Sequence, residues 1–185
     1  LPALDLLPDF KLGSFQYPEK LNAGYELTDA MVEKGFGDHT ALIGNGRQRT
    51  YKELADWTNR LAHVLRDDLG IVPGNRVLIR SANNPAMVAC WLAATKVGAV
   101  VVNTMPMLRA HELQRYIEKA EISHALSDKR LIDELQECAE TCKSLRTVVG
   151  FDGSSDHDAE LDRLALEKPV GFDAVRTGRD DVALL

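Results

Sequence analysis

Apolar residues follow two alternating patterns along most of the chain. Short segments with an apolar centre predict buried strands at residues 77–79, 99–102, 123–127 and 146–150. Stripes with helical spacing predict helices at residues 54–69, 85–95, 111–120, 129–142 and 159–166. Helices that alternate with such strands are typical of a parallel sheet covered on both sides. We therefore predict an α/β fold, doubly wound, with a mainly parallel sheet and helices on both faces.

The beginning of the chain has a different pattern. Residues 1–20 are marked by prolines and predict an irregular lead, whereas residues 21–34 have near-helical apolar spacing that ends at Gly35. Residues 40–43 and 47–51 then flank an Asn-Gly pair, which favours the tight turn of a small β-hairpin. We expect residues 21–185 to form one subdomain whose last strand opens at residue 182.

Helix boundaries can be predicted from short-range chemistry. Thr50 and Glu53 fit a capping box, in which each side chain satisfies a free backbone amide at a helix start. Asn84 precedes a proline, as expected for a cap followed by the first helical turn. Gly70 and Gly98 are placed to end their helices in the left-handed conformation.

Length and composition exclude several classes of protein. The 185 residues, 45% hydrophobic and 27% charged, are enough for a core without disulfide or metal support. The balance of 22 basic against 28 acidic residues gives a net charge of −6, so nucleic acid is not expected as a partner. The longest apolar stretch, 86–102, is interrupted by polar residues and glycine, so we predict no membrane span.

The chain contains no complete catalytic motif. It has neither of the glycine-rich nucleotide loops and no G-x-S-x-G nucleophile turn. Cys90, Cys138 and Cys142 are best explained as reduced, partly buried thiols, which fits a reducing, cytoplasmic location. We assign no catalytic residue and no metal ligand.

One loop is a candidate for ligand contact. Residues 103–109 follow a predicted strand, and ligands of open α/β sheets gather at the carboxyl ends of strands. Arg109, at the end of this loop, is suited to a phosphate or carboxylate, although an ordinary surface cation would have the same sequence context.

Several segments, in order, carry a family resemblance. They are RTYKELA at 49–55, VPGNRVLI at 72–79, the helix and K-x-G-A stretch within 84–100, and DDVALL at 180–185. Together they resemble the amino-terminal part of the adenylate-forming, or AMP-binding, acyl- and aryl-CoA synthetases. Residues 17–23 and 106–113 are most similar to the benzoate and 2-aminobenzoate CoA ligase branch.

The resemblance implies a reaction in two steps for the full-length enzyme. A carboxylate attacks the α-phosphate of ATP to give an acyl-adenylate, and CoA then displaces AMP. It implies ATP, Mg²⁺ and CoA as cofactors and an aromatic carboxylate as substrate. The family's phosphate loop, adenine pocket and catalytic lysine have no counterpart here, so we expect a fragment that stops before the phosphate loop, binds no cofactor and is inactive alone.

The resemblance also bears on Arg109. In some relatives a basic residue directly after the proline matched by Pro106 contacts the nucleotide part of CoA. Here that position is Met107, and Arg109, two residues later, is the candidate replacement for contact with a CoA phosphate.

Other functions remain open at this stage. One is a non-catalytic binding or interaction module with the same half-fold. Another is a different adenylate-forming enzyme, such as a fatty acyl-CoA synthetase or a peptide-synthetase adenylation domain. For a fragment we also expect exposed apolar surface and a possible homo-oligomer.

Overall fold

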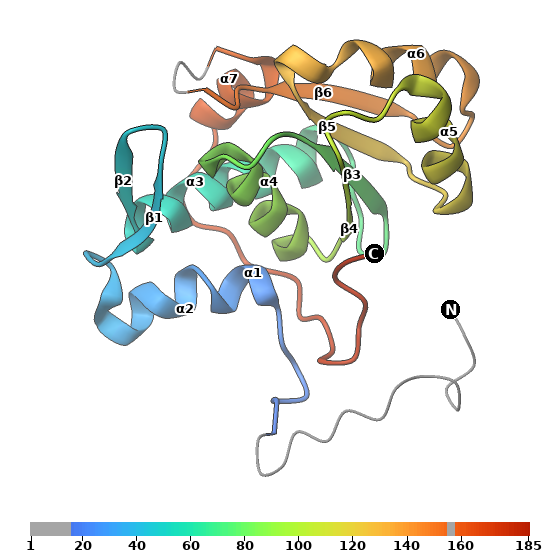
Figure 1. The fold of residues 1–185 in the computed structure, drawn as a ribbon. Coiled ribbons are helices and arrows are strands. Elements are labelled where there is room, and N and C mark those ends of the chain that lie inside the picture. The colour runs from blue at the N-terminus through green and yellow to red at the C-terminus, as the bar shows by residue number, and fades with distance from the viewer. Residues whose placement is uncertain (1–15, 155–157) are drawn as a thin grey trace.

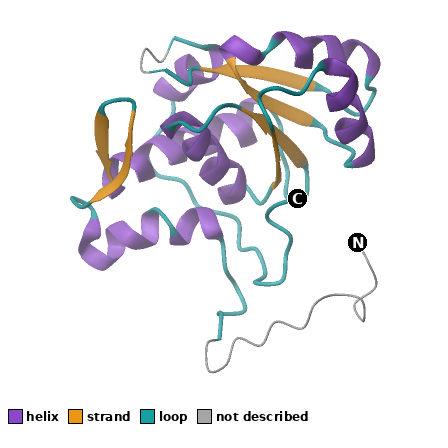
Figure 2. Cartoon of the chain, viewed as in Figure 1, coloured by secondary structure: helices purple, strands orange, loops and turns teal. Residues whose placement is uncertain are grey.

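The fold is built around a sheet of four parallel strands (Figures 1 and 2). The computed structural model describes residues 16–154 and 158–185. The strands lie in the order β4-β3-β5-β6. Their bounds are Arg76–Arg80 for β3, Val100–Thr104 for β4, His124–Asp128 for β5 and Thr147–Phe151 for β6. The predicted α/β class and parallel sheet are confirmed.

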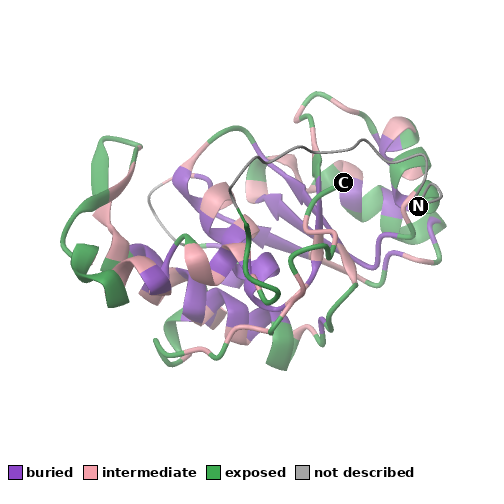
Figure 3. Ribbon diagram, turned by 90° about the horizontal axis from the view of Figure 1, so that it is seen from below, coloured by how far each residue is buried: buried purple, intermediate pink, exposed green. Residues whose placement is uncertain are grey.

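Helices cover both faces of this sheet, as predicted. Val77 and Ile79 of β3 pack into one core with helices α3 (Tyr51–His63), α4 (Pro85–Lys96) and α7 (Glu160–Leu166). Leu78 faces the opposite side, in a second core with α5 (Ala110–Lys119) and α6 (Asp133–Thr141). Side chains that alternate between two apolar cores explain why the centre of each strand is apolar. Figure 3 shows burial concentrated in this centre.

The predicted hairpin is also present. Strands β1 (Thr40–Gly44) and β2 (Arg47–Thr50) pair antiparallel, and the turn places Asn45 at φ 52° and Gly46 at φ 71°. Both residues tolerate a positive φ, which the turn requires. The Asn45 side-chain amide donates to the Gly153 carbonyl at 3.1 Å, so the hairpin tip is tied to the loop that follows β6.

The predicted helix boundaries are formed by the expected contacts. The Thr50 hydroxyl accepts the Glu53 amide at 3.2 Å, and the Glu53 carboxylate accepts the Thr50 amide at 2.8 Å. The Asn84 side chain accepts the Met87 amide at 2.9 Å. Gly70 and Gly98 have φ of 67° and 77°, the left-handed conformation predicted for them.

The prediction of one continuous helix at residues 21–34 is wrong. The structure has two short helices, α1 (Ala23–Glu26) and α2 (Asp29–Met31), followed by a π turn over Val32–Phe36. The break lies at Thr28, whose backbone leaves the helical region and whose hydroxyl donates to the Gly24 carbonyl at 2.5 Å. A hydroxyl that bonds to nearby backbone offers an alternative to helix continuation.

The helix predicted at residues 129–142 is likewise divided. A 3₁₀ turn over Lys129–Leu131 precedes α6, because the carboxylate of Asp128 accepts the Arg130 amide at 3.0 Å and holds the chain in a tight turn. Smaller shifts affect strand ends. β4 continues to Thr104, and β6 ends at Phe151, although the glycine, serines and aspartates of residues 151–158 predict a loop there. Residues 155–157 of that predicted loop lie outside the described residues.

The strand predicted at residue 182 is reduced to a parallel bridge. Leu184 pairs with Val101 of β4, and the Val101 amide donates to Ala183 at 2.9 Å. Nearby, the Leu21 amide donates to the Thr177 carbonyl at 3.0 Å, so a segment near each end of the described chain lies beside the other. In the described part of the chain, no helix is long and apolar enough to cross a membrane.

Candidate functional site

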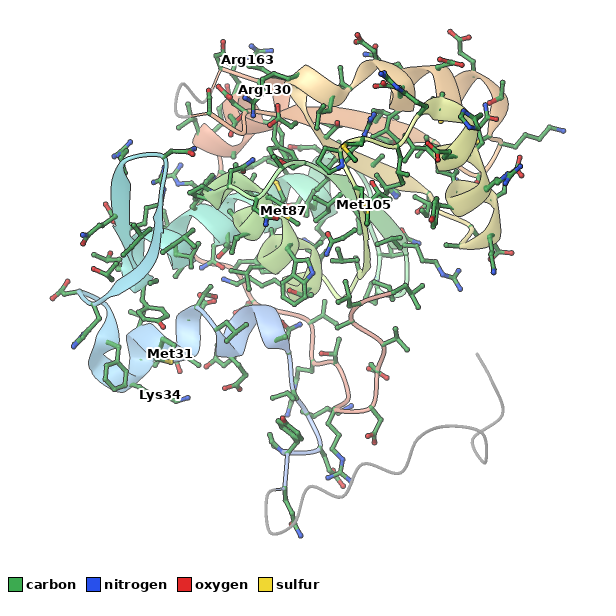
Figure 4. The ribbon with its side chains drawn as sticks, in the orientation of Figure 1. Met31, Lys34, Met87, Met105, Arg130 and Arg163 are labelled. Atoms are coloured by element: carbon green, nitrogen blue, oxygen red, sulfur yellow. The ribbon has the colours of Figure 1, made fainter. Side chains whose placement is uncertain are left out.

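The candidate site lies at the carboxyl edge of the sheet. All four strands are parallel, so their last residues, Arg80, Thr104, Asp128 and Phe151, meet at one edge. In open α/β sheets this edge is where ligands bind. The predicted 103–109 loop leaves it from β4 and leads into α5. Met105 marks this loop in Figure 4.

A buried arginine organises the edge. The Arg80 side chain is 1% exposed. Its Nη2 donates to the carbonyls of Pro106 and Leu108 at 2.9 and 2.7 Å. Its Nη1 donates to the Leu131 carbonyl at 2.8 Å and to Glu134 Oε2 at 2.9 Å. A buried charge is costly unless it is paired and hydrogen-bonded, and these four contacts meet that condition for the two terminal nitrogens.

The loop held by Arg80 carries exposed side chains at its tip. Met105 and Met107 are largely exposed, although both are apolar. The Leu108 amide donates to the Met105 carbonyl at 3.2 Å, which makes the tip a turn. The Arg109 amide donates to Glu112 at 2.9 Å, and α5 begins there. The loop is therefore fixed at its base and accessible at its tip.

Arg109 lies at the mouth of a cleft of about 410 Å³. Its side chain is 74% exposed, and Nη1 donates to Glu134 Oε1 at 2.9 Å. Hydrogen bonds from Arg80, and to a lesser degree from Arg109, hold the pKa of Glu134 below its ordinary value. The cleft is also lined by His111, Asp133 and Glu137. Arg109 is thus an accessible cation whose partner is a carboxylate that is charged at neutral pH.

Sequence reasoning did not find Arg80 or Glu134. Arg109 was named because it follows a strand and a loop, and the structure places it at the sheet edge as that argument requires. Arg80 could have been found by the same rule, because a charged residue directly ends the apolar run of β3. Glu134 lies on α6, and no local pattern connects it with residues 80 and 109.

A second charged cluster lies at the carboxyl ends of β5 and β6. The Asp128 carboxylate is buried and accepts Arg130 Nη2 at 2.6 Å. Arg130 is labelled in Figure 4. Asp152 is also buried, and it accepts the Ser154 hydroxyl at 2.5 Å and Lys129 at 3.2 Å. Burial alone would raise the pKa of Asp152, but these hydrogen bonds outweigh it and lower the pKa. The charged groups of this cluster pair with one another, and they hold the segments that follow β5 and β6 in place.

The thiols do not form a reactive site. Cys90, Cys138 and Cys142 are buried and not in disulfides. Burial raises the pKa of Cys138 to about 11, so its thiol stays protonated at neutral pH. Among residues 16–154 and 158–185, no group of three or more His, Cys, Asp or Glu side chains is arranged to hold a metal ion.

The sequence and the fold both match known proteins. The family described as AMP-binding enzyme matches residues 30–185. The chain is 30% identical over 121 residues to a 3-oxocholest-4-en-26-oate–CoA ligase of Rhodococcus rhodochrous, covering 65% of the chain and 22% of that protein. It is 30% identical over 119 residues to a 3-hydroxybenzoate–CoA ligase of Aromatoleum sp. (strain CIB), covering 64% of the chain and 23% of that protein.

Solved structures share the fold at lower identity. An anthranilate CoA ligase in complex with anthranoyl-AMP has a TM-score of 0.80 at 16% identity, covering 91% of this chain and 31% of that chain. A benzoate CoA ligase from Burkholderia xenovorans LB400 has a TM-score of 0.75 at 21% identity, covering 89% of this chain and 32% of the other. The chain therefore spans about a fifth to a third of the proteins it matches.

Proposed function

The chain belongs to the AMP-binding enzyme family, and from that premise we propose that it forms part of an ATP-dependent ligase that joins a carboxylic acid to CoA. The observation that carries the proposal is the family match over residues 30–185, which includes the whole sheet and its carboxyl edge. The reaction would produce an acyl-adenylate and pyrophosphate from the acid and ATP, and then an acyl-CoA and AMP.

We propose an aromatic acid of the benzoate or 2-aminobenzoate type as the substrate. Support comes from residues 17–23 and 106–113, which resemble that branch, and from the hydroxybenzoate–CoA ligase among the relatives. A second candidate is an aliphatic or steroid side-chain acid, because the Rhodococcus relative, at the same identity, is named for a steroid acid. A panel of acids distinguishes the two.

We further propose that Arg109 contacts a phosphate group of CoA. Arg109 is exposed at the mouth of a cleft, on a loop at the edge where α/β sheets bind ligands. Its planar guanidinium suits two oxygens of one phosphate. The described residues include no cluster of metal ligands, so we assign none of them to Mg²⁺ and no catalytic role in the first step.

The test is ATP-dependent thioester formation by the complete gene product that carries these residues. We expect an aromatic acid–CoA thioester and AMP to accumulate in equal amounts, with benzoate or 2-aminobenzoate preferred over fatty acids. Since these residues span about a fifth to a third of the relatives, we expect no turnover from the 185-residue chain alone. Preference for a fatty acid would support the second candidate. No thioester with any acid would favour a non-catalytic module.

A further inference from the structure

Arg80 connects the two segments that leave the sheet after β4 and β5, the strands on either side of β3. Pro106 and Leu108 belong to the loop after β4, whereas Leu131 and Glu134 follow β5. Because β3 lies between β4 and β5, its last residue is the one placed to reach both sides. Arginine is suited to this position, since its fork presents several donors in fixed directions.

Glu134 divides its two oxygens between two arginines. Oε2 accepts from the buried Arg80 at 2.9 Å, and Oε1 accepts from the exposed Arg109 at 2.9 Å. If Arg109 turns away, the charge of Glu134 is still compensated by Arg80. Arg109 can therefore exchange this carboxylate for another anion without leaving a partly buried charge unpaired, which would otherwise be costly.

We propose that Arg80 is a positioning residue for this exchange: it fixes the 105–109 loop so that Arg109 is held ready to bind a CoA phosphate, and it still pairs with Glu134 when Arg109 leaves that carboxylate. The inference rests on the proposed function, because it takes the anion to be CoA. Arg80 itself is buried, so we do not expect its side chain to touch CoA. Its effect is expected on CoA binding and not on the step that uses ATP.

The main test is Arg80→Lys in the complete gene product. A lysine ammonium has three donors, one fewer than the four hydrogen bonds that Arg80 makes, and it cannot span the same acceptors. We expect the KM for CoA to rise about tenfold, as for the loss of one charge-assisted hydrogen bond. The KM for ATP and the kcat should change less than about twofold. Arg76→Lys, at the other end of β3 in an exposed pair with Glu121, is the matched control.

A double-mutant cycle shows whether Arg80 acts through Arg109. In an Arg109→Ala background, Arg80→Lys should no longer raise the KM for CoA, because the group that it positions is gone. If the two substitutions instead raise the KM for CoA by independent factors that multiply, the proposal is wrong. An equal rise in the KM values for CoA and ATP, which is what general loss of structure produces, would also overturn it.

Glu134→Gln is a second test variant, for which we expect the KM for CoA to change in the opposite direction. The amide oxygen still accepts from Arg80, but the charge that competes with the ligand for Arg109 is removed. We expect the KM for CoA to fall about threefold, as for release of an exposed ion pair. A rise similar to that of Arg80→Lys would contradict the exchange.

Hydrogen exchange on the complete gene product separates failure of this inference from failure of the proposed function. Arg80→Lys should speed exchange of the Leu108 and Arg109 amides, whereas Arg76→Lys should not. Unchanged exchange would overturn the positioning role whatever the activity. Faster exchange, with an active enzyme whose KM for CoA is unchanged, overturns the link to CoA but leaves the ligase proposal intact. An inactive wild-type enzyme overturns both.

Discussion

A buried ion pair lies where α2, α3 and α4 meet. Lys96, at the end of α4, is fully buried and donates to the carboxylate of Asp29 and to the side chain of Asn59. Burial lowers the pKa of Lys96, and its bonds with Asp29 partly offset that effect. Asn59 also donates to Asp29 at 2.8 Å, so α2, α3 and α4 meet at one polar contact inside the molecule.

Lys96→Met should destabilise the protein by about 3 kcal/mol, because it leaves the Asp29 carboxylate without its cation in a mostly buried position. The free energy of unfolding in urea measures the effect. Lys52→Met is the control, since Lys52 makes an exposed pair with Asp56 on α3 and should cost less than about 1 kcal/mol. Equal losses for the two variants would show that the buried pair has no special role.

His124 predicts a dependence of stability on pH. Its Nε2 lies 3.1 Å from the Leu69 carbonyl and its Nδ1 lies 2.8 Å from the Ser123 hydroxyl. Burial lowers the pKa of His124 in the folded state, although the contact with Leu69 opposes the shift. The unfolded chain, with a histidine pKa of about 6.5, then binds the proton more tightly. Stability is therefore full above about pH 6.5 and is lost as pH falls through the lowered pKa of the folded state.

Urea unfolding between about pH 7.5 and 5 tests this expectation. His124→Gln should lose less stability across that range than the wild type, because the titrating group is gone. His111→Gln, at an exposed position on α5, should keep the wild-type slope. Parallel curves for the wild type and His124→Gln would rule out His124 as the source of the pH dependence.

At the residue scale, the sequence predicts the place of a side chain only where neighbouring residues in the chain form a recognisable pattern. Arg109 was found because its loop position has a physical meaning in α/β sheets. Lys96 and Asp29 were missed because their pairing joins residues far apart in the chain, and a lysine at the end of an apolar helix is usually a solvent-exposed cap. Burial of its ammonium is a property of the assembled core.

At the scale of helices and strands, short-range contacts explain both the successes and the errors. The Asn45-Gly46 turn and the cap at Asn84 depend on a few consecutive residues, and each forms as predicted. Two of the errors are breaks within predicted helices. Thr28 and Asp128 cause them because their side chains bond to nearby backbone groups. The apolar spacing on either side does not reveal whether such a bond or the next helical hydrogen bond will form.

The capping box at the start of α3 predicts a measurable loss of stability. Thr50→Ala should lower the free energy of unfolding by about 1 kcal/mol, because the Glu53 amide loses its acceptor. Thr50→Ser keeps the hydroxyl and should retain most of that stability. If the alanine and serine variants are equally stable, the hydroxyl contact does not stabilise the helix.

For the whole molecule, the alternation of helices and strands is sufficient to predict the α/β architecture, but it does not predict the order of the strands in the sheet. Nothing in the sequence pattern places β3 between β4 and β5, yet this order puts Arg80 beside both loops that it binds. The pairing of Leu21 with Thr177 is equally non-local. Leu184 and Leu185 are about half exposed beside β4. The division at residue 20 and the homo-oligomer remain predictions.

The ligase function is tested most directly by following the oxygen atoms of the acid. The complete gene product is incubated with ATP, CoA and an aromatic acid whose carboxylate carries oxygen-18. If the carboxylate attacks the α-phosphate of ATP and CoA then displaces AMP, one labelled oxygen passes from each acid to AMP. Mass spectrometry should show labelled AMP in the same amount as acyl-CoA. Thioester formed with unlabelled AMP, or with ADP in its place, would contradict the account.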